Sequence, residues 1–293
     1  VNPHLYVEQA KDGDWFLTRI DTSKEKKKGL KIRLQSLNFK DADLSLAARS
    51  KTKALNPPVK VRVKSGTARF PQDRDAVEFS VKGQLVTGGN LQVDGVFNTK
   101  TDAIDLEVAA KDVQAREVGH LIVLPLNLEA GEVAGNLEVN IRKAKPPTLK
   151  GTASLKEVTA RIPALPQAFA KTNGQLRFNG YQVELENVSS LFGAIPGVAN
   201  GAIDTQGDYA LKAQTKPVEV AQIVKTLKLP QPAIAIRGEI QSAIQVGGAI
   251  AKPKLAIEAV TTTASRVDKV DFRSIKASLE LIGPTLSVKQ FLA

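Results

Sequence analysis

Cysteine is absent from this sequence, histidine occurs only twice, and aromatic residues make up 5% of the chain. The absence of cysteine excludes disulfides, thiolate metal sites and cysteine nucleophiles. The two histidines, His4 and His120, are far apart in the sequence, which argues against a multi-histidine metal site. Because aromatic rings are scarce, any large apolar surface must be built from Val, Leu, Ile and Ala.

Methionine and long apolar runs are missing as well. The sequence begins at Val1 and contains no methionine, so we expect it to be an internal piece of a longer protein. It has no run of about 18 or more apolar residues, so we expect no part of it to span a membrane. If the parent protein has a membrane anchor, we expect that anchor to lie outside this segment.

Acidic residues are outnumbered by basic ones, and the formal net charge is +11. Such a charge favours anionic partners, namely phospholipid head groups, nucleic acid or acidic protein. The positive charge is spread along the chain, which is typical of the solvated polar faces of many strands. Proteins that bind single-stranded nucleic acid combine a basic groove with exposed aromatic side chains. Here Phe79, Phe97 and Phe178 fall on predicted apolar faces, so we expect no nucleic-acid partner.

Short strands with one apolar face are predicted along most of the chain. The clearest example is GQLRFNGYQVELENVSSLFG, where Asn179-Gly180 is a strong hairpin signal because a type I′ turn needs positive φ at both central residues. Folding about that turn would set Phe178 opposite Tyr181 and Leu176 opposite Val183, all on one face. The fold class is therefore predicted to be mainly β, with short strands joined by tight turns.

Two or three short helices are expected to interrupt the strands. Residues 112–121 begin with Asp112, a suitable N-cap, and carry apolar residues on one face. Residues 217–227 begin with Pro217, which suits a first turn, and carry an apolar i, i+3, i+4, i+7 stripe. A shorter candidate covers residues 165–171. After each of the first two helices come Leu-Pro, a glycine-bearing strand, a proline turn and another strand, which indicates an internal repeat. The repeat divides what we expect to be one continuous structural unit into three parts, residues 1–111, 112–216 and 217–293.

Several glycines fall within predicted strands, in register with the apolar residues. Glycine inside a strand marks a bend, a bulge or a close approach of two backbones, and curved sheets use glycine kinks. Because the missing side chains would all lie on one face, they would let a sheet curl toward its apolar side. A sandwich packed closely at these points is the alternative. The predicted sheet-bending glycines are Gly83, Gly95, Gly135, Gly151 and Gly238.

No constellation of catalytic or cofactor-binding residues is present in the sequence. The serines are scattered, without a G-x-S-x-G motif before a helix. Neither a Walker loop nor a Rossmann fingerprint occurs. Aspartates and glutamates mostly occupy turns or alternate outward along strands, as Glu184 and Glu186 do, which favours solvated carboxylates over an acid/base pair. We therefore expect no enzymatic activity, no cofactor and no metal site.

Two stretches resemble a known family. The opening NPHLYVEQAKDGDWFL has a proline, a hydrophobic strand ending in an acidic residue and then Asp-Gly-x-Trp, and it resembles the element that follows the membrane anchor in AsmA-like and TamB-like proteins. GQLRFNGYQVELENVSSLFG resembles a recurring TamB-type phrase of strand, turn, strand and Phe-Gly. Phe16 departs from the opening motif, which often has a polar residue there. The basic composition and long loops resemble the cyanobacterial and chloroplast-envelope branch.

The resemblance implies an elongated, strongly curved antiparallel or mixed sheet that forms a taco-like trough with an apolar interior. It also implies a location in the periplasm or intermembrane space of a double-membrane envelope, anchored to the inner membrane by a segment not present here. Roles proposed for the family are phospholipid transport along the groove and assembly or translocation of outer-membrane proteins with an Omp85-type partner.

We therefore expect a non-enzymatic segment that shelters phospholipid acyl chains, because aliphatic side chains suit acyl chains and each buried methylene contributes ~0.8 kcal/mol. One alternative is a chaperone or scaffold whose free strand edge pairs with unfolded strands. Another is a plain two-sheet β-sandwich. The residues expected to line the groove are Ile32, Leu34, Val61, Val63, Phe79, Val81, Leu91, Val93, Leu106, Val108, Leu137, Val139, Leu176, Phe178, Val183, Leu185, Ile240, Leu279 and Leu281.

Overall fold

The computed structural model describes most of the chain. Two of the predicted lining residues, Ile32 and Leu34, and the Asp-Gly-x-Trp part of the opening motif lie outside the described residues. The described residues are 4–11, 35–50, 52–71, 75–122, 124, 126–143, 145–163, 165–230, 236–249, 252–282 and 285–293.

The chain divides into two compact units. Unit 1 comprises Val1–Leu128 and Glu132–Ala153, and unit 2 comprises Glu129–Gly131 and Ser154–Ala293. The strand β8 (Thr148–Arg161) is shared, because its first residues belong to unit 1 and its later ones to unit 2. This division does not coincide with the expected boundaries after residues 111 and 216, and the three-part division by sequence repeat stays a prediction.

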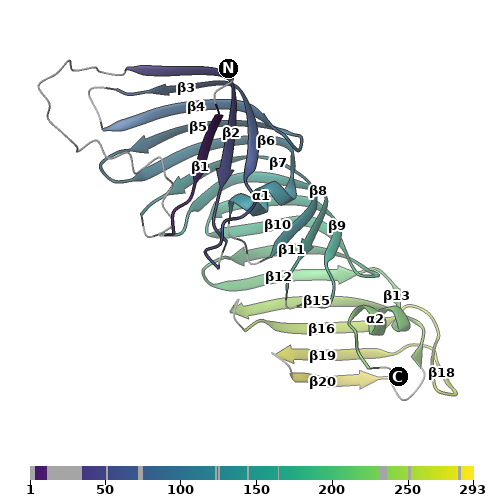
Figure 1. The fold of residues 1–293 in the computed structure, drawn as a ribbon. Helices are drawn as coiled ribbons and strands as arrows, with labels where there is room; N and C mark the ends of the chain where they lie inside the picture. Colours follow the sequence, from purple (N-terminus) through teal and green to yellow (C-terminus); the bar gives the residue numbers. More distant parts are fainter. Residues whose placement is uncertain are drawn as a thin grey trace, which may run out of the picture. The chain divides into compact units, whose positions relative to one another are not determined.

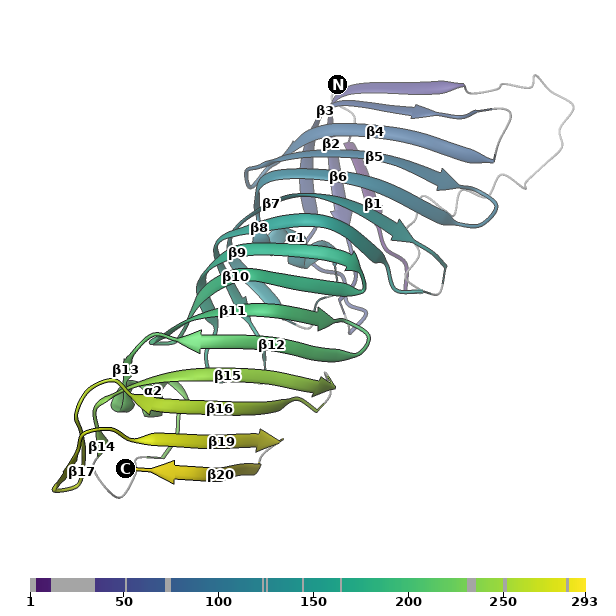
Figure 2. The same cartoon turned by 180° about the vertical axis from the view of Figure 1, so that it is seen from behind.

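Unit 1 is a series of neighbouring strands that wraps around a short helix. Its elements are β1 (His4–Glu8), β2 (Ser36–Ala47), β3 (Val59–Arg69), β4 (Ala76–Leu85), β5 (Asn90–Asn98), β6 (Ala103–Gln114), α1 (Ala115–Leu121) and β7 (Asn127–Ile141). β1 runs parallel to β2, and each strand from β3 to β7 pairs antiparallel with the strand before it. α1 contacts β2, β3 and β6. Both views place α1 on the same side of β4–β7 as β1, so the sheet of unit 1 is curved around the helix (Figure 1, Figure 2).

Unit 2 repeats this arrangement with different strands. Its elements are β9 (Phe169–Gly180), β10 (Gln182–Phe192), β11 (Ile195–Asp204), β12 (Asp208–Thr215), β13 (Val218–Glu219), α2 (Val220–Thr226), β14 (Ile236–Arg237), β15 (Glu239–Ala249), β16 (Lys254–Thr261), β17 (Ser265–Val267), β18 (Val270–Phe272), β19 (Lys276–Ile282) and β20 (Thr285–Leu292). The main ladder runs β9, β10, β11, β12, β15, β16, β19 and β20, with every pair antiparallel. A small separate sheet joins β14, β17 and β18. The predicted fold class, mainly β with a curved mixed sheet and short helices, is confirmed.

Two helices form in the described part of the chain, and both are shorter than predicted. α1 is capped by Gln114, whose side chain makes no capping hydrogen bond, so Asp112 as an N-cap was wrong. Asp112 instead belongs to β6, because pairing of β6 with β7 continues to the residue before the helix. In the same way Val218 and Glu219 pair with β15 before α2 begins.

The third helix candidate, residues 165–171, was also wrong. Residues 165–167 form a bend, and β9 begins at Phe169. The ring of Phe169 packs 4.9 Å from the ring of Phe192 on the neighbouring strand, centroid to centroid. This cross-strand contact is available only when the segment is extended, so pairing with β10 prevails over a weak local helical pattern.

The predicted internal repeat has a structural counterpart. Each helix lies in the connection between two antiparallel neighbours, α1 between β6 and β7, and α2 between β12 and β15. In the first copy β7 is followed by Pro146-Pro147 and β8, and in the second copy β15 is followed by Pro253 and β16. The second copy differs in that the two-residue strand β14 comes between α2 and β15.

The hairpin between β9 and β10 forms with a register two residues away from the predicted one. The turn residues are Gly180 and Tyr181, and Gly180 has φ of +68°. Glycine adopts positive φ without steric cost, and type II′ hairpin turns favour it at their first central position. The turn therefore begins at Gly180, one residue later than predicted. Because the partner of each residue shifts by two positions, every side chain keeps its predicted face. The observed pairs are Asn179 with Gln182, Phe178 with Val183, and Leu176 with Leu185.

Bulges mark points where the strands bend. Asp112 in β6 and Asn187 in β10 have φ of +54° and +49°, and the register shifts around both. The inserted residue turns the next side chain inward, so that Val113 and Val188 are only 4% and 8% exposed. The Asn200 side-chain oxygen on β11 accepts the N–H of Asn187 at 2.7 Å, which satisfies a backbone group that the bulge removes from the ladder.

The most deeply buried cluster lies where α1 meets the sheet of unit 1. Val59, Val61 and Val63 on β3 are 1–2% exposed. Val118 and Leu121 of α1 pack against this cluster. Two predicted groove residues, Val61 and Val63, are therefore in contact with protein atoms on all sides and form part of a closed core.

We expect Gly95 on β5 not to tolerate a methyl group. A Cβ atom there would lie 2.6 Å from the Phe79 ring and 2.8 Å from a Leu106 methyl carbon. Gly95→Ala should therefore lower the free energy of unfolding by about 1–3 kcal/mol in a urea titration. Gly247→Ala is the control, since the nearest atom to its Cβ would be 3.8 Å away. Equal stability of the two variants would contradict this packing.

Candidate functional site: the apolar sheet faces

Strand register in unit 1 collects apolar side chains on one face of β4–β7. Residues directly opposite each other in antiparallel strands point to the same face, so the pairings define rows that cross all four strands. The first three rows are Val77–Phe97–Ile104–Ile141, Phe79–Gly95–Leu106–Val139 and Val81–Val93–Val108–Leu137. Every residue in these three rows is half-buried.

Every predicted lining residue that is described in unit 1 lies on this face. A fourth row, Gly83–Leu91–Ala110–Gly135, continues the face and pairs with Val63 on β3. The list of predicted lining residues omitted the row at the opposite end, although Phe97 in that row was predicted to lie on an apolar face. That row follows the same two-residue alternation one step further along each strand, so the signal was present in the sequence. The residues absent from the list are Val77, Phe97, Ile104 and Ile141.

α1 covers only one end of this face. Around the fourth row, Leu85 is 5% exposed and Val113 is 4% exposed, because α1 packs over them. The first three rows, which include Val81 and Leu106, stay half-buried. The face is therefore a packed core at the α1 end and apolar surface elsewhere.

Unit 2 presents an equivalent face over more strands. Its predicted lining residues in β9, β10, β15 and β19 all fall on this face, and the residues of β11, β12 and β16 were missed. The rows are Phe178–Val183–Ile203–Tyr209, then Leu176–Leu185–Gly201–Leu211–Val246–Leu255–Leu281, then Val188–Ala199–Ala213–Ile244–Ile257–Leu279. Ile240 lies on the same face of β15 as Ile244 and Val246.

The face of unit 2 has little packed over it. Among its described residues, the apolar side chains classed as buried are Val158, Val188 and Val218. α2 is anchored at one end of the ladder, where the Thr226 hydroxyl accepts the N–H of Ala194 at 3.3 Å. Apart from the buried Val188, the row residues, such as Tyr209 and Leu211, are half-buried and shielded from the side by their cross-strand neighbours.

Polar side chains occupy the opposite face of each sheet. In unit 1, Asp94 lies on that face of β5, and its pKa is held below the usual value mainly by a hydrogen bond from Ser80 and then by one from Gln92. The Gln92 amide donates to the Asp94 carboxylate at 2.7 Å, and the charge of Lys82 also favours the ionised form. This carboxylate is therefore ionised at neutral pH and stabilises the polar face.

The predicted sheet-bending glycines mark close approaches. A Cβ at Gly83 would lie 2.9 Å from a Val61 methyl, and one at Gly135 would lie 2.9 Å from the Ala153 Cα atom. Gly151 has φ of +129°, which favours glycine. Gly238 lies between β14 and β15 and not inside a strand. Their role in bending the sheet stays a prediction.

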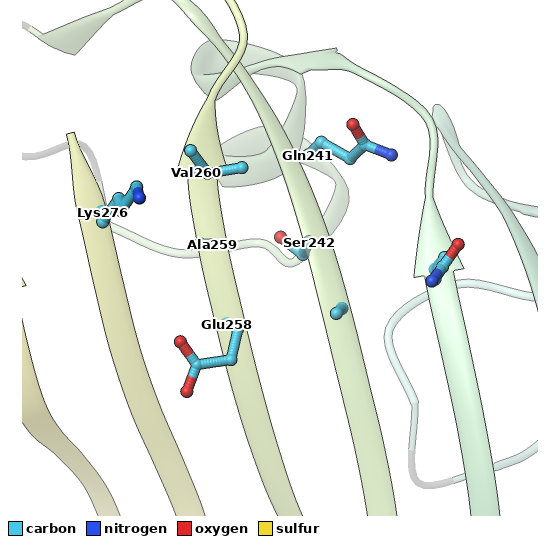
Figure 3. A pocket seen from close by; sticks show the side chains of 8 residues that line it. Gln241, Ser242, Glu258, Ala259, Val260 and Lys276 are labelled. Carbon is cyan, nitrogen blue, oxygen red and sulfur yellow. The ribbon is translucent and has the colours of Figure 1, made fainter. Parts of the chain in front are cut away.

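A shallow cavity of about 240 Å³ opens on β15, β16 and β19 (Figure 3). Gln241 and Val260 pair across β15 and β16 in register with Lys276, and these rows alternate with the apolar ones, so the cavity lies mainly on the polar face. Glu258 in this cavity accepts a hydrogen bond from the Ser278 hydroxyl at 2.7 Å. The cavity thus lies apart from the apolar rows, and its lining side chains Gln214, Gln241, Glu258 and Lys276 are exposed.

No group of three or more His, Asp or Glu side chains in the described ranges is arranged to hold a metal ion. Within the same part of the chain, neither helix is long and apolar enough to cross a membrane.

The sequence is similar to two chloroplast proteins. Over 241 residues it is 24% identical to Protein TIC236, chloroplastic, of Arabidopsis thaliana, and the matched region makes up 77% of this chain and 11% of that protein. Over 237 residues it is 22% identical to Protein SUBSTANDARD STARCH GRAIN 4, chloroplastic, of Oryza sativa subsp. japonica, and the matched region makes up 76% of this chain and 11% of that protein. No family model matches the sequence, and no solved structure matches it.

These similarities support a distant relationship to chloroplast proteins, in line with the chloroplast branch that the sequence resemblance indicated. The chain spans only 11% of the length of either relative. The activities of such long proteins therefore come to this chain only as proposals.

A glutamate placed in the closed part of the unit 1 face should lower the free energy of unfolding more than a glutamate placed on the half-buried rows. Val63→Glu places a carboxylate in the α1 core, and we expect it to cost several kcal/mol or to unfold unit 1. Leu106→Glu places the same group on the uncovered rows, where water can reach it, and we expect a cost of roughly 1 kcal/mol. Circular dichroism during urea unfolding measures both. Equal losses in the two variants would show that the rows are a closed core.

Proposed function

We propose that this chain is a non-enzymatic segment of a TamB-like envelope protein, and that its apolar sheet faces hold phospholipid acyl chains. The observation that carries this proposal is the set of apolar rows whose side chains stay half-buried in the folded chain, such as the row through Leu106 and the row through Leu185. A contiguous set of incompletely buried apolar side chains on one face is typical of a binding surface. Acyl chains suit it because they need no hydrogen-bond partner and gain ~0.8 kcal/mol per buried methylene.

The arrangement of the rows also suits movement of a lipid within each unit. Every row crosses successive strands without a charged residue, for example from Leu176 on β9 to Leu281 on β19. A bound acyl chain can therefore pass from strand to strand while it stays in contact with aliphatic side chains. Such a surface selects for apolar length, and transport on it needs no chemical step.

The location we propose is the space between two membranes of an envelope, with an anchor supplied by a part of the parent protein outside this segment. The similarity to two chloroplast proteins supports a chloroplast envelope. An Omp85-type partner and a role in lipid transport between membranes follow from the resemblance to TamB-like proteins, and we propose them for the parent protein as a whole.

One observation favours a second function, that of a scaffold for unfolded strands. β20 pairs with β19 on one side, and Val288 and Phe291 on it are 62% and 60% exposed. Exposed apolar side chains beside a strand edge suit a partner that pairs as an added strand. The third alternative, a two-sheet sandwich, requires a closed core, which the three buried apolar side chains in the described part of unit 2 do not supply.

Phospholipid that stays bound during purification tests the lipid proposal. We expect mass spectrometry of the chain purified without detergent to detect phospholipid, and the double variant Leu106→Glu/Leu185→Glu to retain several-fold less of it. Ala109→Glu is the matched control, because Ala109 is exposed on the polar face of β6 and pairs with Gln92 and Asn136, which are uncharged. Absence of lipid from the unmodified chain, or equal retention by the double variant, would refute the proposal.

A further inference from the structure

Charge is distributed unevenly over the polar face of unit 1, the face opposite to its apolar rows. Paired residues of neighbouring strands share a face, so the polar residues also form rows across the sheet. Three rows lie toward the α1 end of the strands, and together they carry five Lys or Arg side chains and one Asp. These rows, the basic end of the face, are Tyr6–Ser45–Lys60, His4–Asp43–Arg62–Gln84–Asn90–Lys111 and Lys40–Ser65–Lys82–Gln92–Ala109–Asn136.

The charge reverses toward the other end of the same strands. Two rows there, the acidic end of the face, carry five carboxylates and one Arg. They are Asn38–Thr67–Ser80–Asp94–Glu107–Glu138 and Ser36–Arg69–Glu78–Val96–Asp105–Asn140. The fold therefore gathers at one end of this face positive charge that is spread along the sequence.

The two ends are far enough apart to act separately on a partner. On β4, the row of Arg62 passes through Gln84 and the row of Arg69 passes through Glu78, six residues away, which corresponds to roughly 20 Å of strand. Charges in solvent are screened over about 8 Å at physiological ionic strength. The outermost acidic row therefore does little to weaken the attraction of an anion to the row of Arg62.

Carboxylates at the acidic end have partners within unit 1. The Arg142 guanidinium lies 2.6 Å from the Asp105 carboxylate, and the Lys150 ammonium lies 4.0 Å from the Glu138 carboxylate. The basic end differs, because no ion pair joins its cations to any other residue that the structure describes. These cations are all exposed, and they are Lys40, Lys60, Arg62, Lys82 and Lys111.

Two exposed side chains with apolar surface accompany the basic end. Tyr6 is 49% exposed and pairs in register with Ser45, which pairs with Lys60. On the other side of Lys60, Val86 is 58% exposed, and its N–H donates to the Lys60 carbonyl at 2.9 Å. Tyrosine and lysine both combine an apolar body with a polar tip, which suits the boundary between lipid tails and head groups. Basic side chains around exposed apolar ones are typical of a surface that lies on an anionic bilayer.

We infer that the basic end of the unit 1 polar face docks on the surface of a bilayer that contains anionic phospholipid. The contact uses the side of the sheet opposite to the apolar rows, so it goes beyond the function proposed above and does not depend on it. Because the acidic end is repelled by the same bilayer, the α1 end of the strands makes the contact.

A bilayer fits these charges better than a folded acidic protein does. No side-chain hydrogen bond to a described residue holds any of the five cations in place. A folded partner would have to order each long side chain at one position, at a cost in conformational entropy, whereas mobile lipid head groups adjust to the cations. A second copy of this chain would offer its acidic end, but Asp105 and Glu138 there already have basic partners.

Vesicle co-sedimentation of the full chain tests the docking. We expect stronger binding to vesicles of phosphatidylcholine with phosphatidylglycerol than to vesicles of phosphatidylcholine alone. The difference should disappear at about 1 M salt, where charges are screened over about 3 Å. Lys60→Gln/Lys82→Gln should weaken binding to the anionic vesicles about 30-fold, since each basic side chain near an anionic surface contributes about 1 kcal/mol. Lys100→Gln/Lys150→Gln is the control, because it removes the same charge from cations that already form ion pairs.

A fluorophore at either end of the face locates the contact. The chain has no natural cysteine, so Val86→Cys and Val96→Cys can each be labelled with nitrobenzoxadiazole. Both valines are exposed on the polar face, Val86 beside Lys60 and Val96 in an acidic row. We expect the emission of the label at Val86 to shift to the blue when anionic vesicles are added, and the emission of the label at Val96 to stay unchanged.

Several results would overturn the inference. Equal loss of binding in the two double variants, or equal emission shifts at Val86 and Val96, would show that the basic end is not the contact. Binding of soluble polyglutamate without binding of anionic vesicles would assign the basic end to an acidic protein. A salt-sensitive dimer that Lys60→Gln/Lys82→Gln abolishes, again without binding of anionic vesicles, would assign it to a second copy. Equal binding to vesicles with and without phosphatidylglycerol would also overturn the inference and leave the acyl-chain proposal standing, since that proposal fails separately if no phospholipid co-purifies.

Discussion

Cross-strand register is the constraint on which the rest of this structure depends. A strand alternates its side chains with a period of two, so an apolar residue stays with other apolar residues only if every pair of strands keeps its register. Here the register aligns Val81, Val93, Val108 and Leu137 across four strands of unit 1. A slip by one residue in any strand would place charged side chains among them.

The apolar faces differ from an ordinary β-sheet core in how they are covered. α1 packs over only one end of the unit 1 face, and three buried apolar side chains are all that the described part of unit 2 contains. The aliphatic rows are therefore stabilised by neighbours within the sheet, as where the Phe79 ring and the Leu106 side chain lie over Gly95. Such a face leaves apolar surface for a ligand, and a chain of methylenes matches it without any specific polar contact.

Alternation and turn signals predicted the strands and the face of each described lining residue. The hairpin register was missed by two residues, because the signal Asn179-Gly180 does not say which residue of the pair begins the turn. The predicted helices began too early, because strand pairing continues past Asp112 in β6 and includes Val218. Pairing with a strand distant in sequence cannot be read from a local pattern. The burial of Val63 was also not predictable, since its alternation is the same as that of Val81 and only the position of α1 distinguishes them.

The half-buried apolar rows of unit 1 should be open to a small molecule in the folded protein. The chain has no natural cysteine, so single cysteines introduced at Val93 and Val63 can be compared by their reaction with a maleimide. We predict that Val93→Cys reacts in the folded, lipid-free chain and is protected when phospholipid is added, while Val63→Cys reacts only after unfolding. A Val93→Cys thiol as unreactive as Val63→Cys in the folded, lipid-free chain would contradict the account.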